Sequence, residues 1–345
     1  AVARALSIDA KVLILDEPTA ALTDTEIEGL FAVLRSLRDE GVAIVYVSHR
    51  LEEVFALCDR LTVMRNGRTI VTKDVSDSSI DDVISTMVGR EQNELYPERG
   101  PGGGKVMLSV EGLSGRRVKD VSFQVRAGEV VGVGGLAGSG RSELLRLLAG
   151  AQRSSAGIVH VDGAAVMGRG VGRALDAGIA LVPEERRAQG VILSAPIADN
   201  IAIANLKSVS PGGIVSQRRI VQLAKQALTD LRIKARSVRQ PVGQLSGGNQ
   251  QKVVLAKMLA RNPKVLLMDE PTRGIDVGTK AEIYRLIREL AATGTAVVAV
   301  SSELPELIGL SDRILVMHEG RISGEVDADS ADDELILTYA YGRDA

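Results

Sequence analysis

The sequence is poor in aromatic residues and in cysteine. Its 345 residues include no Trp, three Phe and five Tyr, so binding by aromatic stacking, as in many readers of single-stranded nucleic acid, has few residues to build on. The single Cys58 cannot form a disulfide within the chain, which fits a reducing compartment. Lys and Arg (42) nearly balance Asp and Glu (44), so no overall charge attracts a polyanion. A nucleic-acid partner is therefore disfavoured.

Long apolar runs are missing as well. None approaches the roughly 20 residues of a membrane-spanning helix, and residues 1–10 lack the layout of a secretory signal. We therefore expect a soluble intracellular protein. The composition is otherwise that of a globular chain, with 45% hydrophobic and 25% charged residues, and the length suggests two domains. Residues 1–10 are typical of a helix end leading into a strand, an unusual place for a domain to begin.

A long internal repeat explains this abrupt start. Residues 11–19, Lys-Val-Leu-Ile-Leu-Asp-Glu-Pro-Thr, recur at 264–272 as Lys-Val-Leu-Leu-Met-Asp-Glu-Pro-Thr, an offset of 253 that holds without a gap for nearly sixty positions. Unrelated segments of similar composition would not keep one register for so long. We predict a partial first copy at 1–95, a Pro- and Gly-rich linker at 96–104 and a complete second copy at 105–345. The first copy would lack an N-terminal part.

The second copy contains a glycine-rich loop between an expected strand and an expected helix. An apolar β-branched run at 130–133 leads into Gly134-Gly-Leu-Ala-Gly-Ser-Gly-Arg-Ser142, and a helical pattern follows at 143–148. Backbone N–H groups in such a loop can surround a phosphate, and the helix dipole favours the negative charge. A tight strand–helix turn without a ligand is the structural alternative.

The loop matches the phosphate-binding pattern G-x-x-x-x-G-K-[ST] with one substitution. Gly135 and Gly140 occupy the glycine positions, with Gly138 between them, and Ser142 occupies the position of the magnesium-binding hydroxyl. Arg141 stands where the pattern has lysine. Arginine keeps the positive charge but replaces a compact ammonium with a bulkier planar group. We therefore expect a weakened nucleotide site.

Each copy also carries an acidic pair directly after a four-residue apolar run. The pairs are Asp16-Glu17 and Asp269-Glu270. A carboxylate at the end of a buried strand can hold the Mg²⁺ that bridges phosphates, and the next carboxylate can polarise an attacking water. A helix cap would explain one pair, but not its recurrence after an apolar strand. We predict Asp16, Asp269 and Ser142 as metal ligands, and Glu17 and Glu270 as catalytic residues.

The stretch 244–252, Gln-Leu-Ser-Gly-Gly-Asn-Gln-Gln-Lys, resembles the signature of the ABC ATPases and lies about twenty residues before an Asp-Glu pair, as in that family. Its Ser246, Gly247 and Gly248 would present a hydroxyl and backbone N–H groups to a γ-phosphate at a helix N-terminus. Gln250 belongs to the same nucleotide-binding stretch. A Ser-capped helix after a glycine turn is the local alternative.

Other positions resemble further elements of this family. Glu184 takes the place of the glutamine in the Q-loop, and His49 resembles the switch histidine, a catalytic residue. Ser302 aligns with His49 in the second copy. Asp276 resembles the D-loop aspartate. No aromatic residue lies in 108–118, where the family usually places the one that stacks on adenine.

Within the ABC ATPases, the sequence is similar to the ATP-binding subunits of monosaccharide importers, most of all the ribose type. The resemblance rests on the fused copies, the Gly-Arg-Ser loop, Pro183-Glu-Glu-Arg-Arg187, the signature and Pro271-Thr-Arg-Gly-Ile-Asp276. It implies an α/β P-loop NTPase fold, duplicated in tandem, with a parallel-sheet core, a helical subdomain and an antiparallel β subdomain. A soluble ABC ATPase without a transport role and a hydrolysis-deficient remnant are the alternatives.

The resemblance also implies a function. ATP and Mg²⁺ would be bound, and hydrolysis would drive uptake of a monosaccharide. The partners would be integral membrane permease subunits and, through them, a sugar-binding protein, with this subunit at the cytoplasmic face of the membrane. The two copies of a full-length chain would pair and enclose two ATP molecules. Residues 190–200 would contact the permease, and the sugar itself is not encoded in this subunit.

The resemblance implies unequal sites. The site with Asp16, Glu17 and His49, closed by the signature, would be the competent one. The site built on the loop of the second copy carries three substitutions and would be mainly structural or regulatory; these are Arg141 for lysine, Ser302 for histidine and Glu184 for glutamine. The first Walker loop would lie in the part that the first copy lacks, so the 345-residue chain alone would hydrolyse ATP poorly.

Overall fold

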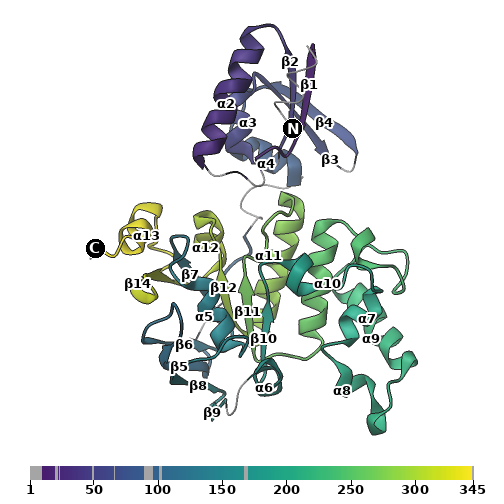
Figure 1. Cartoon of the computed structure of the whole chain (residues 1–345), viewed down its shortest axis with the longest axis vertical. Coiled ribbons are helices and arrows are strands. Elements are labelled where there is room, and N and C mark those ends of the chain that lie inside the picture. The colour runs from purple at the N-terminus through teal and green to yellow at the C-terminus, as the bar shows by residue number, and fades with distance from the viewer. Residues whose placement is uncertain are drawn as a thin grey trace. The chain divides into compact units, whose positions relative to one another are not determined.

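The computed structural model describes residues 10–19, 22, 24–48, 50–65, 67–88, 96–100, 103–166 and 170–343. Packing divides the chain into two compact units (Figure 1). The first comprises residues 1–95 with 276–279, and the second comprises residues 96–275 with 280–345. None of the described helices is both long and apolar enough to pass through a bilayer.

The first unit alternates strands and helices. A parallel pair of strands is followed by an antiparallel hairpin, and the helices pack against them. In chain order the elements are β1 (Val12–Asp16), α2 (Asp24–Asp39), β2 (Ala43–Val47), α3 (Leu51–Leu57), β3 (Arg60–Arg65), β4 (Arg68–Asp74), the 3₁₀ turn η1 (Val75–Asp77) and α4 (Ile80–Val88). Helix α2 buries Ile27, Phe31 and Leu34, a spacing that places them on one face of the helix.

One face of the β1–β2 sheet is exposed. Val12 and Ile14 are 56% and 69% exposed, and Val45 and Val47 are 49% and 47% exposed. Successive side chains of a strand point to opposite faces, and the opposite face of β1 is buried. The sheet therefore presents an apolar stripe on one side only.

The second unit is built around a six-stranded sheet with the order β10-β11-β12-β7-β13-β14. Its strands are β7 (Val130–Gly135), β10 (Ile179–Val182), β11 (Val265–Asp269), β12 (Ala296–Val300), β13 (Arg313–His318) and β14 (Arg321–Asp327). All neighbours pair in parallel except β13 and β14. The expected parallel core thus ends in an antiparallel edge strand, because Glu319 and Gly320 both have positive φ (43° and 86°) and close a tight hairpin.

Both faces of this sheet are covered. On one face lie α5 (Arg141–Leu148) and an antiparallel sheet of β5 (Val106–Ser114), β6 (Val121–Arg126), β8 (Ala156–Val161) and β9 (Ala164–Ala165). On the other face lie α12 (Leu304–Leu310) and α13 (Asp333–Ala340). Strands β11 and β12 are buried throughout, as expected for central strands of a covered parallel sheet. Helices α6 (Val171–Ala177) and α11 (Val277–Ala292) complete the α/β part.

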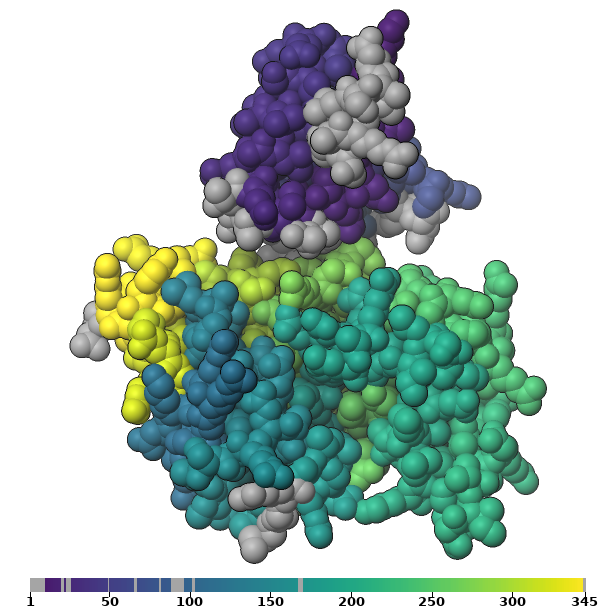
Figure 2. Space-filling model, in the orientation of Figure 1, coloured from purple at the N-terminus to yellow at the C-terminus, as the bar shows by residue number. Residues whose placement is uncertain are grey.

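A helical part lies beyond the β10 edge of the central sheet, at the other end of the unit from the antiparallel sheet (Figures 1 and 2). It follows β10 and returns to the core through β11. Its elements are η3 (Arg186–Gly190), α7 (Ile197–Ala202), α8 (Leu206–Val209), η4 (Pro211–Gly213), α9 (Gln217–Asp230), η5 (Val242–Gln244) and α10 (Gly247–Leu259). The fold is therefore the α/β arrangement that the sequence predicts.

The repeated sequence forms the same succession of elements twice. Strands β1 to β4 and helices α2 and α3 correspond in both bounds to β11 to β14, α11 and α12 when they are shifted by the offset of the sequence repeat. The first residue of α4 corresponds in the same way to that of α13. The positions that correspond to the exposed stripe on β1 and β2 are buried in the second unit, where α5 and the antiparallel sheet cover them.

Candidate functional site

The glycine-rich loop connects β7 to α5 and depends on glycine at defined positions. Gly135, Gly138 and Gly140 have φ of 136°, 82° and 103°, which side chains disfavour. A Cβ at Gly135 would also lie 2.3 Å from the carbonyl oxygen of Met317. Gly140 precedes the first residue of α5, so the loop ends at a helix N-terminus, where backbone N–H groups favour an anion.

The hydroxyl of the loop contacts the first carboxylate of the acidic pair. Ser142 Oγ donates to Asp269 Oδ1 at 2.8 Å, and Arg146, one helical turn later, places Nη2 3.9 Å from Asp269 Oδ2. Asp269 is 2% exposed at the end of β11. Burial raises the pKa of Asp269 to about 6, although the hydrogen bond from Ser142 opposes the shift. Two hard oxygen donors therefore meet below the phosphate loop.

The second carboxylate adopts a strained backbone conformation. Glu270 has φ of 47° and Glu17 has φ of 44°, values that are uncommon outside glycine. Their N–H groups donate to the neighbouring strand, at Val300 and Val47, over 2.9 and 2.8 Å. Both acidic pairs thus turn in the same way after their strand.

A serine of the adjacent strand end holds Glu270. Ser302 Oγ donates to Glu270 Oε2 at 3.0 Å, and Glu270 is 9% exposed. Burial raises the pKa of Glu270, while Ser302 and the charge of Arg141 act in the opposite direction. The hydroxyl of Ser302 therefore reaches the carboxylate of Glu270 from the position where the first copy has histidine.

Arg141 extends from α5 to the end of β12. Its Nη1 donates to the carbonyl oxygen of Ser301 at 2.7 Å. The planar guanidinium suits a contact with a carbonyl at the end of a neighbouring strand, and a lysine would offer a single point charge instead. The substitution in the phosphate pattern therefore has a definite partner.

Glu184 forms an ion pair that the sequence did not reveal. It pairs with Arg273, which follows the Pro-Thr of the second acidic motif. Arg186 donates to the carbonyl oxygens of Arg273 and Gly274 at 2.9 and 3.3 Å. Burial lowers the pKa of Arg186. These contacts connect the segment after β10 to the loop after β11, and the complementary charges were the only signal for them in the sequence.

The signature residues lie at the start of α10. Ser246 is exposed, precedes the first helical residue, and accepts a hydrogen bond from Asn249 Nδ2 at 2.9 Å. A Cβ at Gly247 would lie 2.9 Å from Arg186 Nη2, so glycine permits this close approach. Gly248 is buried.

Gln250 supports the signature loop. It is 2% exposed, and its Nε2 donates to the carbonyl oxygen of Leu245 at 3.0 Å. Its side chain is thus held within the helical part of the unit.

The remaining predicted residues are more scattered. Asp276 caps α11 by accepting from the N–H and hydroxyl of Thr279 at 3.0 and 2.8 Å. Asp16 and Glu17 follow each other at the end of β1. His49 lies outside the described residues. The structure therefore brings together Arg141, Ser142, Asp269 and Glu270 at the carboxyl end of the central sheet.

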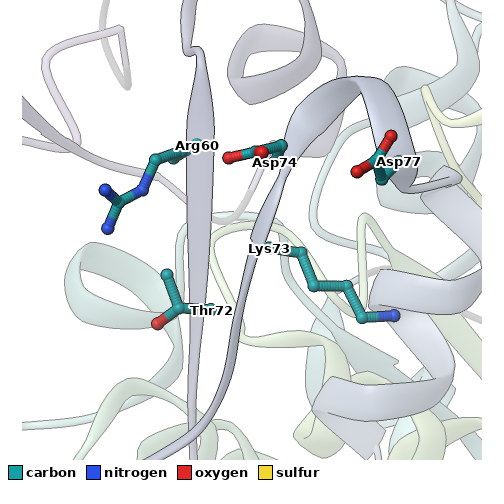
Figure 3. Close-up of a pocket in the computed structure, with 5 residues that line it drawn as sticks. All are labelled: Arg60, Thr72, Lys73, Asp74 and Asp77. Atoms are coloured by element: carbon teal, nitrogen blue, oxygen red, sulfur yellow. The ribbon is translucent and has the colours of Figure 1, made fainter.

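A separate depression of about 440 Å³ lies on the β3–β4 hairpin of the first unit (Figure 3). Its lining residues are Arg60, Thr72, Lys73, Asp74 and Asp77. The side chains of Arg60 and Lys73 extend in opposite directions. Because these cations do not converge and two carboxylates share the lining with them, the depression does not resemble the anion site of the phosphate loop.

The comparisons with known proteins agree with this geometry. Residues 118–273 match the family model described as ABC transporter. The chain is 48% identical over 342 residues to the ribose import ATP-binding protein RbsA of Bacillus licheniformis, covering 99% of this chain and 69% of that protein. The protein of the same name from Bacillus subtilis gives the same values. The chain belongs to the ABC transporter family.

Solved structures support the fold of this ABC protein. A dimeric ATP-binding cassette in a post-hydrolysis state with ADP and Pi is similar with a TM-score of 0.56 and 24% identity, over 64% of this chain and 99% of that chain. Binding and hydrolysis of ATP are the activities of this ATPase family, so the phosphate loop and the acidic pair are the expected elements of an ABC nucleotide site.

Proposed function

We propose that this chain is the ATP-binding subunit of an importer that couples ATP hydrolysis to uptake of a monosaccharide of the ribose type. The contact between Ser142 and Asp269 carries the proposal, because it places the loop hydroxyl and the strand-end carboxylate in one site. The names of the relatives at 48% identity support the sugar class. In this proposal residues 1–95 and 105–345 are parts of two nucleotide-binding domains joined by the linker 96–104.

The oxygen donors fit a magnesium ion. A protein usually holds Mg²⁺ through one or two carboxylates, with substrate phosphates and water completing the octahedron. Ser142 and Asp269 in the second unit, and Asp16 in the first, are the ligands that we propose. Among the described residues no group of three His, Cys, Asp or Glu side chains could hold a metal by itself, so the phosphates would share the ion. When bound, Mg²⁺ neutralises charge on the phosphates.

The other side chains have distinct roles in this proposal. Arg141 and the N–H groups of Gly135, Gly138 and Gly140 bind phosphate oxygens. Glu270 in one site, and Glu17 with His49 in the other, orient the attacking water. The buried carboxylate of Glu270 can accept the proton that the water loses, because burial raises its pKa.

Residues outside this cluster complete the nucleotide-binding set that we propose. The set consists of Glu184, Ser246, Gly247, Gly248, Gln250 and Asp276. Glu184 would leave Arg273 when it engages the nucleotide, because one carboxylate cannot serve both contacts at full strength. The signature at the start of α10 would donate N–H groups to a γ-phosphate.

The chain would act at the cytoplasmic face of the membrane through permease subunits and, through them, a sugar-binding protein. We assign the permease contact to residues 190–200, which lead from η3 into α7. Ile192 and Leu193 are 51% and 37% exposed there, and exposed apolar side chains of this kind suit a protein interface.

The nucleotide site is tested by removing its metal ligand. We expect Asp269→Asn to weaken Mg²⁺-dependent binding of a fluorescent ATP analogue by at least tenfold, about 1.4 kcal/mol, and to leave metal-free binding nearly unchanged. Asp312→Asn is the matched control, because Asp312 accepts from Val130 N at 2.7 Å at the opposite end of β7. Equal loss of affinity in both variants would contradict the assignment.

The transport role needs a second experiment. Vesicles that contain the cognate permease are loaded with ATP and given ribose, xylose or galactose together with the sugar-binding protein. We expect uptake of a pentose only when this subunit is present and carries an intact Asp269. Uptake that is independent of the subunit would contradict the proposed coupling.

A further inference from the structure

A buried glutamate of α12 connects two ends of the nucleotide site. Glu306 is 2% exposed and accepts from Thr272 Oγ1 at 2.8 Å and from Ser301 Oγ at 2.5 Å. Thr272 follows Glu270 by two positions, and Ser301 directly precedes Ser302. The carboxylate of Glu306 therefore spans the same two segments as the hydrogen bond between Ser302 and Glu270.

Ser301 also fixes the turn at the following position. Its Oγ accepts from the backbone N–H of Glu303 at 3.0 Å while its hydroxyl hydrogen points to Glu306. This hydroxyl thus connects the residues on both sides of Ser302. With a donor and an acceptor partner in place, the Ser301 side chain has one favoured orientation.

The first unit repeats this arrangement. Glu53 is 4% exposed and accepts from Thr19 Oγ1 at 2.8 and 2.9 Å and from Ser48 Oγ at 3.1 Å. Ser48 Oγ accepts from the backbone N–H of Arg50 at 3.0 Å. These positions correspond to those of the second unit by the offset of the sequence repeat. The first unit therefore contains the same brace, by which we mean a buried carboxylate that accepts from a hydroxyl on each of the two turns.

The surroundings of the two glutamates differ, although the brace does not. In the first unit Tyr46 on β2 donates its hydroxyl to Glu53 at 2.7 Å, with Phe31 edge-on to its ring. In the second unit Tyr284, on α11, occupies the position of Phe31 and hydrogen-bonds Thr272, while residue 299 is alanine. The packing around the glutamate thus differs between the two units, whereas the carboxylate and its Thr and Ser hydroxyl partners are the same in both.

A purely structural role would not require a carboxylate here. Desolvating a charged group costs free energy that an apolar side chain of the same size would avoid. The two hydroxyls that the carboxylate accepts from lie on the two segments that carry the catalytic groups. A carboxylate at position 306 is therefore explained by the two segments that it connects, because it accepts a hydrogen bond from each of them.

We propose that Glu306 and Glu53 are positioning residues of the two nucleotide sites. Each braces the turn after the acidic pair against the turn after the next strand. In the second unit the brace sets the distance between Ser302 and Glu270. The inference rests on the proposed function, because its catalytic consequence requires that Glu270 act on ATP.

The test replaces one carboxylate oxygen of Glu306 by an amide group and leaves the shape of the side chain nearly unchanged. Gln at position 306 offers one acceptor oxygen instead of two, so one hydroxyl loses its partner. We expect Glu306→Gln to accelerate hydrogen exchange of the Glu303 amide about tenfold by loosening the turn locally. We also expect ATP turnover at saturation to fall about tenfold while the KM for ATP changes less than twofold.

Glu129→Gln is the matched control. Glu129 is 9% exposed and accepts from Arg126 N and from Arg313 Nε, both at 2.6 Å, directly before β7 and far from its loop end. We expect this variant to lower the melting temperature as much as Glu306→Gln does. Exchange at Glu303 and ATP turnover should stay at the wild-type values.

A double-mutant cycle tests whether Glu306 acts through Ser302. If it does, adding Glu306→Gln to Ser302→Ala will not slow turnover further, because coupled residues are not additive. Additive losses, or exchange at Glu303 within twofold of wild type, would overturn the proposal. The exchange measurement needs no nucleotide. A wild-type chain that neither binds nor hydrolyses ATP would contradict the proposed function, and the exchange result would then still decide whether Glu306 holds the turn.

Discussion

The side chain at the lysine position illustrates how one substitution changes a phosphate site. Arg141 donates to the carbonyl oxygen of Ser301. Burial raises the pKa of Glu270, and the charge of Arg141 opposes this rise. While Nη1 holds the carbonyl oxygen, the guanidinium can offer a phosphate only its remaining N–H donors, in the orientation that this contact sets. The site therefore contains a competition that lysine would reduce.

We expect Arg141→Lys to tighten binding of a fluorescent ATP analogue roughly fivefold, about 1 kcal/mol. A compact ammonium can reach a phosphate without first giving up the contact that Arg141 Nη1 makes with the carbonyl oxygen of Ser301. Equilibrium titration in the presence of Mg²⁺ measures the change. Arg153→Lys, at an exposed position, serves as the control and should bind like the wild type. Weaker binding in Arg141→Lys would contradict the competition.

Glu306 gives the protein a pH-dependent stability. Burial raises its pKa to about 6, the nearby charge of Glu303 acts in the same direction, and hydrogen bonds from Ser301 and Thr272 with the charge of Lys280 oppose the shift. The folded state favours the protonated carboxyl. The contribution of Glu306 to the free energy of unfolding is therefore fully present below the unfolded pKa, roughly 4.3. It is lost as the pH rises through the folded pKa of about 6.

Glu306→Gln removes this titration. Between pH 4.5 and pH 7 we expect the wild type to lose about 2 kcal/mol of unfolding free energy relative to the variant, because only the wild type has the carboxyl that titrates. Urea unfolding at the two pH values measures it. An identical pH dependence in both proteins would show that the carboxyl at position 306 titrates normally.

Helix α12 connects the nucleotide site to the segment between the two sequence copies. The ring of Tyr96 stacks on Tyr284 with centroids 5.0 Å apart, and a Cβ at Gly309 would lie 2.5 Å from the Tyr96 ring. Arg99 donates to the carbonyl oxygen of Ile308 at 2.8 Å and pairs with Asp329. The first residues of the expected linker therefore pack on the second unit.

We expect Tyr96→Ala to destabilise the second unit by about 2 kcal/mol, because a half-buried stacked ring is lost. Urea unfolding followed by far-ultraviolet circular dichroism measures the effect. Tyr341→Ala is the control, since Tyr341 is 60% exposed and should change stability by less than about 0.5 kcal/mol. Equal effects of the two substitutions would mean that the stacking contributes nothing.

At the scale of the whole molecule, the equivalent strands of the two sequence copies differ in how far they are buried. In the second unit the strands β11 and β12 are covered on both faces, and in the first unit the stripe of Val12, Ile14, Val45 and Val47 is exposed. Apolar patches of this kind promote association. The first unit should therefore determine the solubility of this polypeptide.

We expect the double substitution Ile14→Lys and Val45→Lys to reduce fluorescence of a hydrophobic dye by roughly half and to suppress self-association. Light scattering and dye binding measure both effects. Ile214→Lys is the control, because Ile214 is 78% exposed and does not belong to the stripe. A similar decrease with Ile214→Lys would show that the stripe is not the main dye-binding surface.

Order and spacing along the chain were sufficient to predict much of the protein. The constant register of the repeat predicted which elements recur, and the apolar runs before Asp16 and Asp269 predicted strands that the structure contains. The loop at 134–142 and the stretch at 244–252 indicated the family, and the comparisons confirmed it. These features are local, because loop glycines, strand alternation and motif spacing depend on neighbours in sequence.

The partners of the polar side chains were decided by tertiary structure alone. Arg141 bonds Ser301, Glu184 pairs with Arg273, and Glu306 joins two turns that follow different strands. No periodicity encodes such contacts, since they arise where strand ends from distant parts of the chain meet at one edge of the sheet. The sequence therefore specified the kind of site, and the folding of β7, β11 and β12 side by side specified which atoms hold it together.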